Sequence, residues 1–188
     1  LKRQVKISLP PLRIKIMNTK KHKPILGISI GDINGIGVEV TLRALLDARV
    51  YKNFTPLIYG HGKVISHYRK LMELEDFNFS QIRNLDEIQH RKINVINVVE
   101  ECPEIMPGVE TIEAGKLALT ALKAAVNDLK EGKIQGLVTA PVNKNNINSE
   151  DFKFVGHTEF ITESVGAKDS LMMMVGEGLR VGLVTGHL

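Results

Sequence analysis

The sequence is poor in the residues that build disulfide-linked, membrane-spanning and base-stacking proteins. Its 188 residues include one cysteine, no tryptophan, three tyrosines and six phenylalanines. A single cysteine excludes a disulfide framework within the chain, and so few aromatic residues provide no platform on which bases could stack. No apolar run approaches the roughly 20 residues that a membrane-spanning helix needs. We therefore expect a cytoplasmic protein that binds neither nucleic acid nor membrane.

Positive charge is concentrated at the beginning of the chain, although the net charge is only +4. Residues 1–23 are rich in lysine and arginine, contain Pro10-Pro11 and show no sustained hydrophobic period. Met17 looks like a natural start, so residues 1–16 are interpreted as an extension that precedes the folded protein. We expect residues 1–23 to be a disordered or appended tail, outside the fold.

From residue 24 onward, strand-like and helix-like patterns alternate. Runs of β-branched residues predict strands, and apolar residues at helical spacing predict helices. The predicted strands cover residues 25–30, 55–60, 93–98 and 136–140, and the predicted helices cover residues 38–46, 61–74, 111–130 and 157–165. Such alternation is typical of an α/β domain with a mostly parallel sheet and flanking helices. We place this first domain at residues 24–150.

Two further strand patterns lie near the end of the chain. Residues 171–175 and 179–184 flank Gly176-Glu177-Gly178, and this arrangement predicts a hairpin. The three methionines at 172–174 are interpreted as core residues, because thioethers fill irregular gaps well. The sequence stops soon after the second strand. We therefore expect residues 151–188 to be the beginning of an incomplete second domain.

A glycine-rich turn, residues 31–37, joins the first predicted strand to the first predicted helix. Such a turn brings backbone amides and a helix N-terminus close to a bound anion or polar substrate. Its glycines lack the Gly-x-Gly-x-x-Gly spacing, and no Lys-Ser or Lys-Thr pair follows Gly37, so we exclude both common nucleotide-binding motifs. A merely structural turn stays open as the alternative. Asp32 and Asn34 in this turn are possible cleft-lining residues.

The residues with the richest chemistry follow the strand predicted at 136–140. We interpret that run as a buried strand that ends at Pro141, because proline supplies no amide donor. Ligands of open α/β sheets lie beyond the carboxyl ends of strands, so polar residues after this one are placed for chemistry. The candidates are Lys144, His157, Thr158 and Glu159. An ordinary asparagine-rich loop followed by a capped helix stays open as the alternative.

Three other reactive side chains are interpreted as structural. Cys102 lies among glutamates, which raise the pKa of a thiol, so it is not expected to be a nucleophile. His61 and His67 have no partner at metal-ligand spacing and are interpreted as residues of a helix surface. None of the three is expected in the site.

Five blocks of the sequence together closely resemble the 4-hydroxythreonine-4-phosphate dehydrogenase family. They are GDINGIG at 31–37, TAPVNK at 139–144, GHTEF at 156–160, LMMMVGEGLRVGLVTGHL at 171–188, and the helix predicted between Thr111 and Lys130. The resemblance covers residues 23–188 and corresponds to about the N-terminal half of the family's usual length. It implies an isocitrate/isopropylmalate dehydrogenase-like fold with two α/β domains and a homodimer.

The same resemblance implies an activity. Family members oxidise the 3-hydroxyl of 4-phosphonooxy-L-threonine with NAD (or NADP), and the keto acid decarboxylates to 3-amino-2-oxopropyl phosphate in pyridoxal phosphate biosynthesis. A divalent metal (Zn, Mg or Co) lowers the pKa of the substrate hydroxyl and stabilises the charge that forms during decarboxylation. Motif by motif, His157 and Thr158 are expected to contact substrate, and His187 to be one of three metal ligands. Lys144 is expected to supply positive charge or a proton-transfer site.

The sequence departs from the family in two respects. Ile33-Asn34 stand where Pro-Ala is more common, which changes the stiffness of the first turn. The other metal ligands, the phosphate-binding cations and most of the nicotinamide site belong to the half that is absent here, so this chain alone is expected to be inactive. Two alternatives stay open: a paralogous 4-phospho-D-threonate or 4-phospho-D-erythronate dehydrogenase, and a non-catalytic fragment that binds a phosphorylated ligand.

Overall fold

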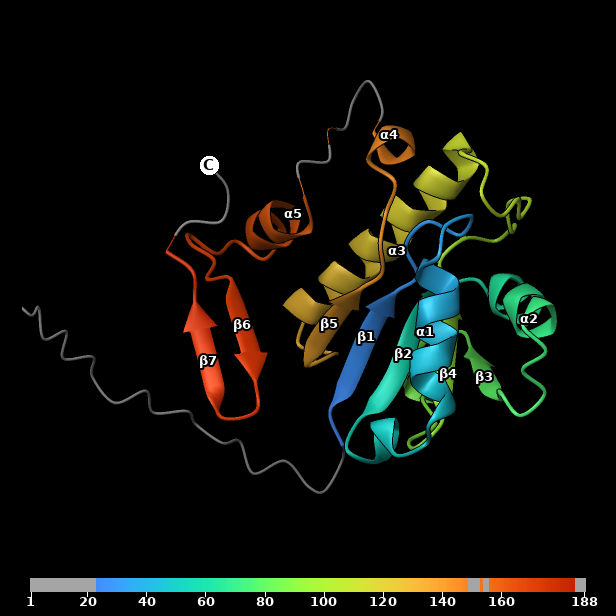
Figure 1. The fold of residues 1–188 in the computed structure, drawn as a ribbon, viewed down its shortest axis with the longest axis horizontal. Coiled ribbons are helices and arrows are strands. Elements are labelled where there is room, and N and C mark those ends of the chain that lie inside the picture. Colours follow the sequence, from blue (N-terminus) through green and yellow to red (C-terminus); the bar gives the residue numbers. More distant parts are fainter. Residues whose placement is uncertain (1–22, 149–152, 154–155, 185–188) are drawn as a thin grey trace, which may run out of the picture.

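A five-stranded parallel sheet forms the main body of the structure (Figure 1). The structure is a computed structural model that describes residues 23–148, 153 and 156–184. The strand order is β3-β4-β2-β1-β5, and all pairings in this sheet are parallel. The strands are β1 (Ile25–Ser29), β2 (Thr55–Gly60), β3 (Phe79–Ile82), β4 (Ile93–Asn97) and β5 (Gly136–Thr139). The predicted α/β class with a mostly parallel sheet is confirmed.

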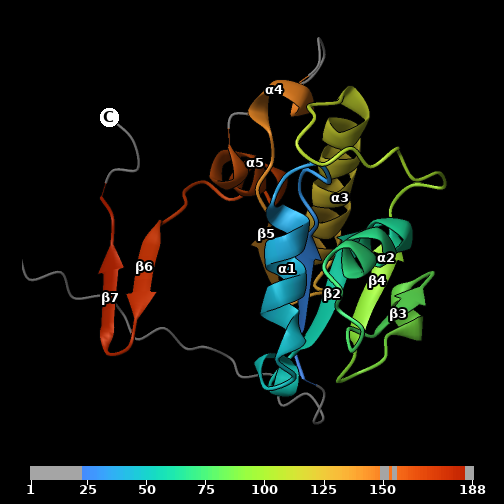
Figure 2. The ribbon, with the colours of Figure 1, turned by 45° about the vertical axis from the view of Figure 1, so that its right-hand side comes forward.

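Helices cover both faces of this sheet. Figures 1 and 2 show α1 (Gly37–Leu46) and α2 (Gly62–Leu71) over one face and α3 (Ile112–Lys130) over the other. Two short helices, α4 (Lys144–Ile147) and α5 (His157–Ser164), lie beside α3. Single 3₁₀ turns, η1 (Val50–Lys52) and η2 (Leu85–Glu87), complete the connections. In the part of the chain that the structure describes, no helix has the length and apolar character to cross a membrane.

The core lies between the sheet and these helices. The central strands contribute fully buried side chains such as Leu57 and Val95, because a parallel sheet is covered on both faces. α3 presents small buried residues to the sheet, which allows close packing, and Thr111 caps its start as predicted. The Thr111 hydroxyl oxygen accepts a hydrogen bond from the Ala114 amide at 3.3 Å. The prediction of α3 is therefore confirmed to within one residue.

The sequence predicted that β5 is a buried strand, and the predicted burial is wrong. It lies at the edge of the sheet, its residues are mostly half-buried, and Val138 is 52% exposed. Leu137 packs against α3, whereas Val138 points to the other face, which α1 covers only in part. The continuous apolar run indicated the strand itself, but it did not reveal that only one face of the strand would be covered.

The predicted hairpin is confirmed, but the predicted burial of its methionines is wrong. β6 (Met173–Gly176) and β7 (Leu179–Gly182) pair antiparallel, with Met174 opposite Val181. Every residue of both strands is exposed, and Met174 is 66% exposed. Figures 1 and 2 show the hairpin apart from the five-stranded sheet. The methionines are exposed because the hairpin lies beyond the core that the helices and the five-stranded sheet share.

Candidate functional site

The carboxyl ends of β1 and β5 bring two of the predicted loops together. β1 and β5 are parallel neighbours, so the glycine-rich turn after β1 meets the loop after β5. The Asp32 amide donates a hydrogen bond to the Pro141 carbonyl oxygen at 2.9 Å. Gly31 has a φ of +70°, and a Cβ at this position would collide with the same carbonyl. Glycine is therefore required where the two loops cross.

A pocket of about 390 Å³ opens between these loops. Its walls come from Asp32, Asn34, Gly35 and Ile36 in the turn, from 108–110 before α3, and from 141–143 after β5. Two larger hollows, of about 720 and 780 Å³, lie along α2 and beyond the ends of β3 and β4. None of the predicted site residues lines either of those two. We therefore centre the candidate site on the smaller pocket and the helices beside it.

Asp32 and Asn34 line this pocket, and their polar atoms are bonded within the protein. The Asn34 side-chain amide donates to the Val109 carbonyl at 2.9 Å and to the Thr111 hydroxyl at 3.1 Å, and its oxygen accepts from the Met106 amide at 2.8 Å. The Asp32 carboxylate accepts a hydrogen bond from the backbone amide of Asn34 at 2.9 Å. Both side chains are more than nine-tenths buried. Asn34 therefore ties the turn to the segment before α3.

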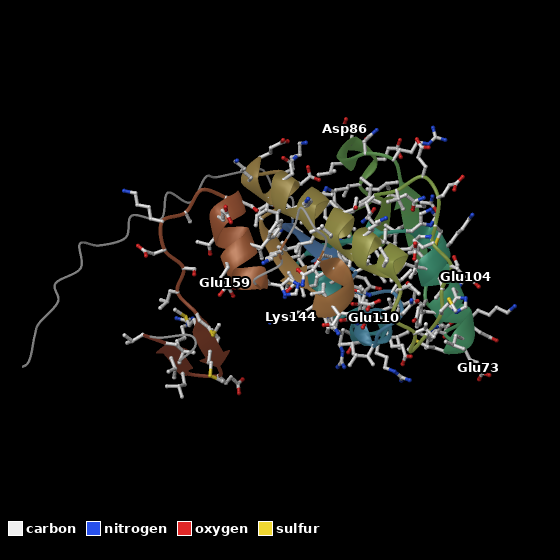
Figure 3. All side chains as sticks on the ribbon, turned by 90° about the horizontal axis from the view of Figure 1, so that it is seen from above. Glu73, Asp86, Glu104, Glu110, Lys144 and Glu159 are labelled. Carbon is white, nitrogen blue, oxygen red and sulfur yellow. The ribbon has the colours of Figure 1, made fainter. Side chains whose placement is uncertain are left out.

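Lys144 is the first residue of α4, and its side chain is exposed. Asn143 caps this short helix by accepting a hydrogen bond from the Asn145 amide at 2.9 Å. The side-chain amides of Asn143 and Asn145 both donate to the Glu110 carboxylate, at 2.8 and 3.4 Å. In Figure 3, Lys144 lies between Glu110 and Glu159 on one side of the molecule. The helix thus places a cation beside the pocket.

α5 places the other predicted residues next to α4. Its residues Phe160 and Ile161 share an apolar cluster with Ile147 of α4 and with Leu122 and Val126 of α3. His157 begins α5 and is half-buried, and burial together with the nearby Lys144 charge lowers the pKa of its imidazole. The charge of Lys144 therefore acts on His157, and together with burial it favours the neutral imidazole.

Thr158 and Glu159 lie on the first turn of α5. The Thr158 carbonyl accepts a hydrogen bond from the Thr162 hydroxyl at 2.7 Å, within the helix. The Glu159 carboxylate folds back over Gly156, so closely that a Cβ at Gly156 would collide with it. Glu159 is exposed and lies where a helix N-terminus favours negative charge. Glu159 is not among the residues that line the pocket between the two loops, so its cleft-lining role stays a prediction.

The predicted metal site is not represented in the described part of the chain. His187, the expected ligand, lies outside the described residues. Among residues 23–148, 153 and 156–184, no group of three or more histidine, cysteine, aspartate or glutamate side chains is arranged to hold a metal ion. These residues therefore do not form a metal centre by themselves.

Two side chains set aside in the sequence behave differently from expectation. His61 is only 4% exposed and caps α2, where its Nδ1 accepts from the Lys63 amide at 3.1 Å, so its prediction as a surface residue is wrong. The side chain turns back over its own helix end, which a helical pattern does not reveal. His67 is exposed, as predicted. Burial, rather than the neighbouring glutamates, raises the pKa of the Cys102 thiol.

Two residues that hold the site together were not among the predicted site residues. The Asn146 side-chain amide donates to the Asp32 carboxylate at 3.2 Å, and Asn146 is only 6% exposed. A Cβ at Gly115 of α3 would collide with the Asn146 backbone carbonyl, so α4 rests directly on α3 at this glycine. The sequence signal for this close approach of α4 to α3 was Gly115 itself, a glycine inside a strongly helical pattern.

Acidification is expected to destabilise the fold. Burial lowers the pKa of both His61 and His157 in the folded chain, so below the ordinary histidine pKa of about 6.5 the unfolded chain binds more protons. The stabilisation from the neutral imidazoles is present above that pH and is lost as the pH falls through and below it. Urea unfolding at pH 7.5 and 5.5 measures the effect.

The matched variants for this measurement are His157→Gln and His67→Gln. His157→Gln is expected to reduce the difference in unfolding free energy between the two pH values, because it removes one of the buried imidazoles. His67→Gln changes an exposed histidine and is expected to keep that difference. Equal pH dependence in the original chain and in His157→Gln would contradict the prediction.

Comparison with known proteins agrees with the resemblance seen in the sequence. The family model described as pyridoxal phosphate biosynthetic protein PdxA matches residues 52–188. A 4-hydroxythreonine-4-phosphate dehydrogenase of Bacteroides thetaiotaomicron is 39% identical over 170 residues, which cover 90% of this chain and 46% of that protein. A Clostridium botulinum protein, provisionally named as a D-threonate 4-phosphate dehydrogenase, is 30% identical over 171 residues, which cover 89% of this chain and 51% of that protein.

A solved structure supports the same relationship. The crystal structure of a 4-hydroxythreonine-4-phosphate dehydrogenase from Burkholderia phymatum superposes with a TM-score of 0.79 at 29% identity, and the match covers 89% of this chain and 51% of that one. The chain therefore spans about half the length of the relatives that it matches. The family model covers well over half of the chain, and the chain accordingly belongs to the PdxA family of pyridoxal phosphate biosynthetic proteins.

Proposed function

We propose that this chain supplies Lys144, His157 and Thr158 to the active site of a dehydrogenase acting on 4-phosphonooxy-L-threonine. The substrate is oxidised to a 3-keto acid, which decarboxylates to 3-amino-2-oxopropyl phosphate in pyridoxal phosphate biosynthesis. The observation that carries the proposal is the convergence of Lys144 and His157 beside the carboxyl end of β5, in a chain 39% identical to a named 4-hydroxythreonine-4-phosphate dehydrogenase.

The charge and protonation of these residues suit a phosphorylated amino acid. Lys144 attracts its anionic groups, and the positive end of the α5 helix dipole adds a smaller attraction of the same sign. The lowered pKa of His157 favours its neutral form, in which the ring has one donor and one acceptor nitrogen. The Thr158 hydroxyl offers a further donor and acceptor on the same helical turn. Together these groups orient the substrate.

The proposed activity also involves a cofactor and a metal. NAD (or NADP) accepts the hydride, and a bound divalent metal such as Zn, Mg or Co supplies Lewis-acid chemistry. His187 remains the proposed metal ligand from this chain. For the full-length protein we also propose a homodimer in the cytoplasm.

A paralogous reaction is the second candidate. The similarity to a Clostridium botulinum protein provisionally named as a D-threonate 4-phosphate dehydrogenase favours oxidation of 4-phospho-D-threonate, in which a hydroxyl replaces the amino group. The same three residues suit both substrates, since both are small phosphorylated acids. The lower identity, 30% against 39%, places this candidate second.

A chimera tests the proposed function. This chain replaces the matching half of the Bacteroides thetaiotaomicron enzyme, and NADH formation is measured with each substrate. Turnover of 4-phosphonooxy-L-threonine is expected to exceed that of 4-phospho-D-threonate by at least about tenfold, a factor worth about 1.4 kcal/mol. Exclusive use of the phospho-sugar acid would defeat the first candidate. The Bacteroides thetaiotaomicron enzyme itself serves as the positive control for the assay with 4-phosphonooxy-L-threonine.

Calorimetry on this chain alone tests the remaining alternative, a non-catalytic phosphate-binding fragment. We expect no tight binding of 4-phosphonooxy-L-threonine in the absence of metal and NAD, and no NADH formation when both are added. Tight binding by the chain alone would instead support the fragment.

A further inference from the structure

Asn146 is a buried polar residue in α4, two positions after Lys144. Its side-chain amide donates to the Asp32 carboxylate at 3.2 Å, and both residues are more than nine-tenths buried. Asp32 belongs to the turn after β1, and that turn is fixed by the bond from the Asp32 amide to the Pro141 carbonyl at 2.9 Å. The Asn146 bond therefore links α4 to the most tightly determined loop of the site.

α4 needs such a link because four residues cannot sustain a helix. Short isolated helices are unstable in water, so tertiary contacts must hold this one. The Glu110 bonds to Asn143 and Asn145 lie at the exposed surface, where water competes for them. Ile147 packs on α3 and α5, but apolar contacts are not directional. The buried bond to a carboxylate is the strong directional contact among these.

Asn146 is not the residue that packing alone would favour at this place. Its side-chain oxygen is buried and has no hydrogen-bond partner in the part of the chain that the structure describes. A buried amide with one unsatisfied atom is costly, and an apolar side chain would avoid that cost. The backbone of Asn146 also lies against Gly115, so α4 has little room to shift. These observations indicate a role in placement.

We infer that Asn146, through its buried hydrogen bond to Asp32, is a positioning residue that fixes α4 and so holds Lys144 beside the start of α5. In this role Asn146 acts on Lys144 through the placement of α4. The inference rests on the proposed function only in treating Lys144 and His157 as groups of one active site. The placement itself is a property of the folded chain without substrate.

The test is a double-mutant cycle that reads the electrostatic coupling of Lys144 and His157 by NMR titration of the His157 ring. Lys144→Met is expected to raise the pKa of His157, because a nearby positive charge is lost. In an Asn146→Ala background, Lys144→Met is expected to shift that pKa by less than roughly half as much. If the coupling between Lys144 and His157 in the Asn146→Ala background equals that in the original chain, the inference is overturned.

Two control backgrounds separate positioning from other effects. Asn145→Ala changes an exposed residue of the same helix and is expected to leave the coupling unchanged. Asp32→Asn is also expected to preserve it, since a rotated Asn146 amide can accept from the new amide and keep the link. A loss of coupling in Asn145→Ala equal to that in Asn146→Ala would show general loosening of α4 and overturn the specific role of Asn146.

A second variant covers the case in which Asn146→Ala does not fold, as judged by circular dichroism. Asn146→Ser keeps a small polar group that is too short to reach Asp32, and it is expected to lose the coupling to the same extent. Because no substrate, NAD or metal is present, the result does not depend on the enzymatic proposal. Retained coupling in Asn146→Ser would sink the inference even if the chimera is an active dehydrogenase.

Discussion

Gly31→Ala is expected to lower the free energy of unfolding by about 3 kcal/mol, more than alanine at Gly115 or Gly132. Two costs add. The φ of +70° is a left-handed conformation, which disfavours any residue with a Cβ by about 1 to 2 kcal/mol. The new Cβ would also collide with the Pro141 carbonyl, a backbone atom held by its bond to the Asp32 amide. The loops after β1 and β5 must separate to admit it.

Gly132→Ala is the matched control for this prediction. Gly132 has a φ of +72°, but nothing lies within 4 Å of the Cβ that alanine would add. It should therefore show the conformational cost alone, about 1 kcal/mol. Urea unfolding, followed by circular dichroism, measures both variants. Equal destabilisation by the two substitutions would show that the crossing of the two loops does not constrain Gly31.

Gly115→Ala is expected to destabilise the chain by about 2 kcal/mol, although the same change stabilises most helices. Replacing glycine by alanine inside a helix usually contributes up to about 1 kcal/mol of stability. Here the added Cβ would collide with the Asn146 backbone carbonyl, and a backbone atom cannot turn away as a side chain can. α4 must move off α3, which carries Lys144 away from His157 as well.

Thr120→Ala on the same helix is the control for Gly115→Ala. Thr120 is only partly buried, and its hydroxyl bonds the Lys116 carbonyl of its own helix at 2.8 Å. This change gains helix propensity without a collision, so it should be neutral or slightly stabilising. Thermal unfolding distinguishes the two variants, since 1 kcal/mol corresponds to roughly 2 to 4 °C for a chain of this size. A stabilising Gly115→Ala would mean that α4 does not rest on α3 at this glycine.

Local patterns in the sequence predicted most elements of the fold because the elements are regular. α3 was predicted to within one residue, since its apolar face repeats at helical spacing and Thr111 caps it. The turn signal at Gly176–Gly178 likewise predicted the hairpin. Exposure was harder to predict, as Val138 and Met174 show. Whether a strand face is covered depends on which elements pack against it, and local periodicity carries no information about those.

The candidate site was predictable in part, for the same physical reason. Lys144 and His157 stood out because polar residues after a strand end face the ligand side of an α/β sheet, and a family resemblance pointed to the same motifs. The bond between Asp32 and Asn146 joins residues 114 positions apart, and no local pattern encodes it. Neither residue type is unusual in its own segment. Only the folded chain shows that the two meet.

The exposed hairpin has a consequence for handling the protein. Thioethers in water are accessible to peroxide, and oxidation to sulfoxide would turn Met173 and Met174 from apolar into polar side chains. The same strands offer unpaired edges and bare apolar surface to a neighbouring molecule, a combination that promotes aggregation. Solubility and shelf life of preparations should therefore respond to the redox state of this segment before the five-stranded sheet itself is affected.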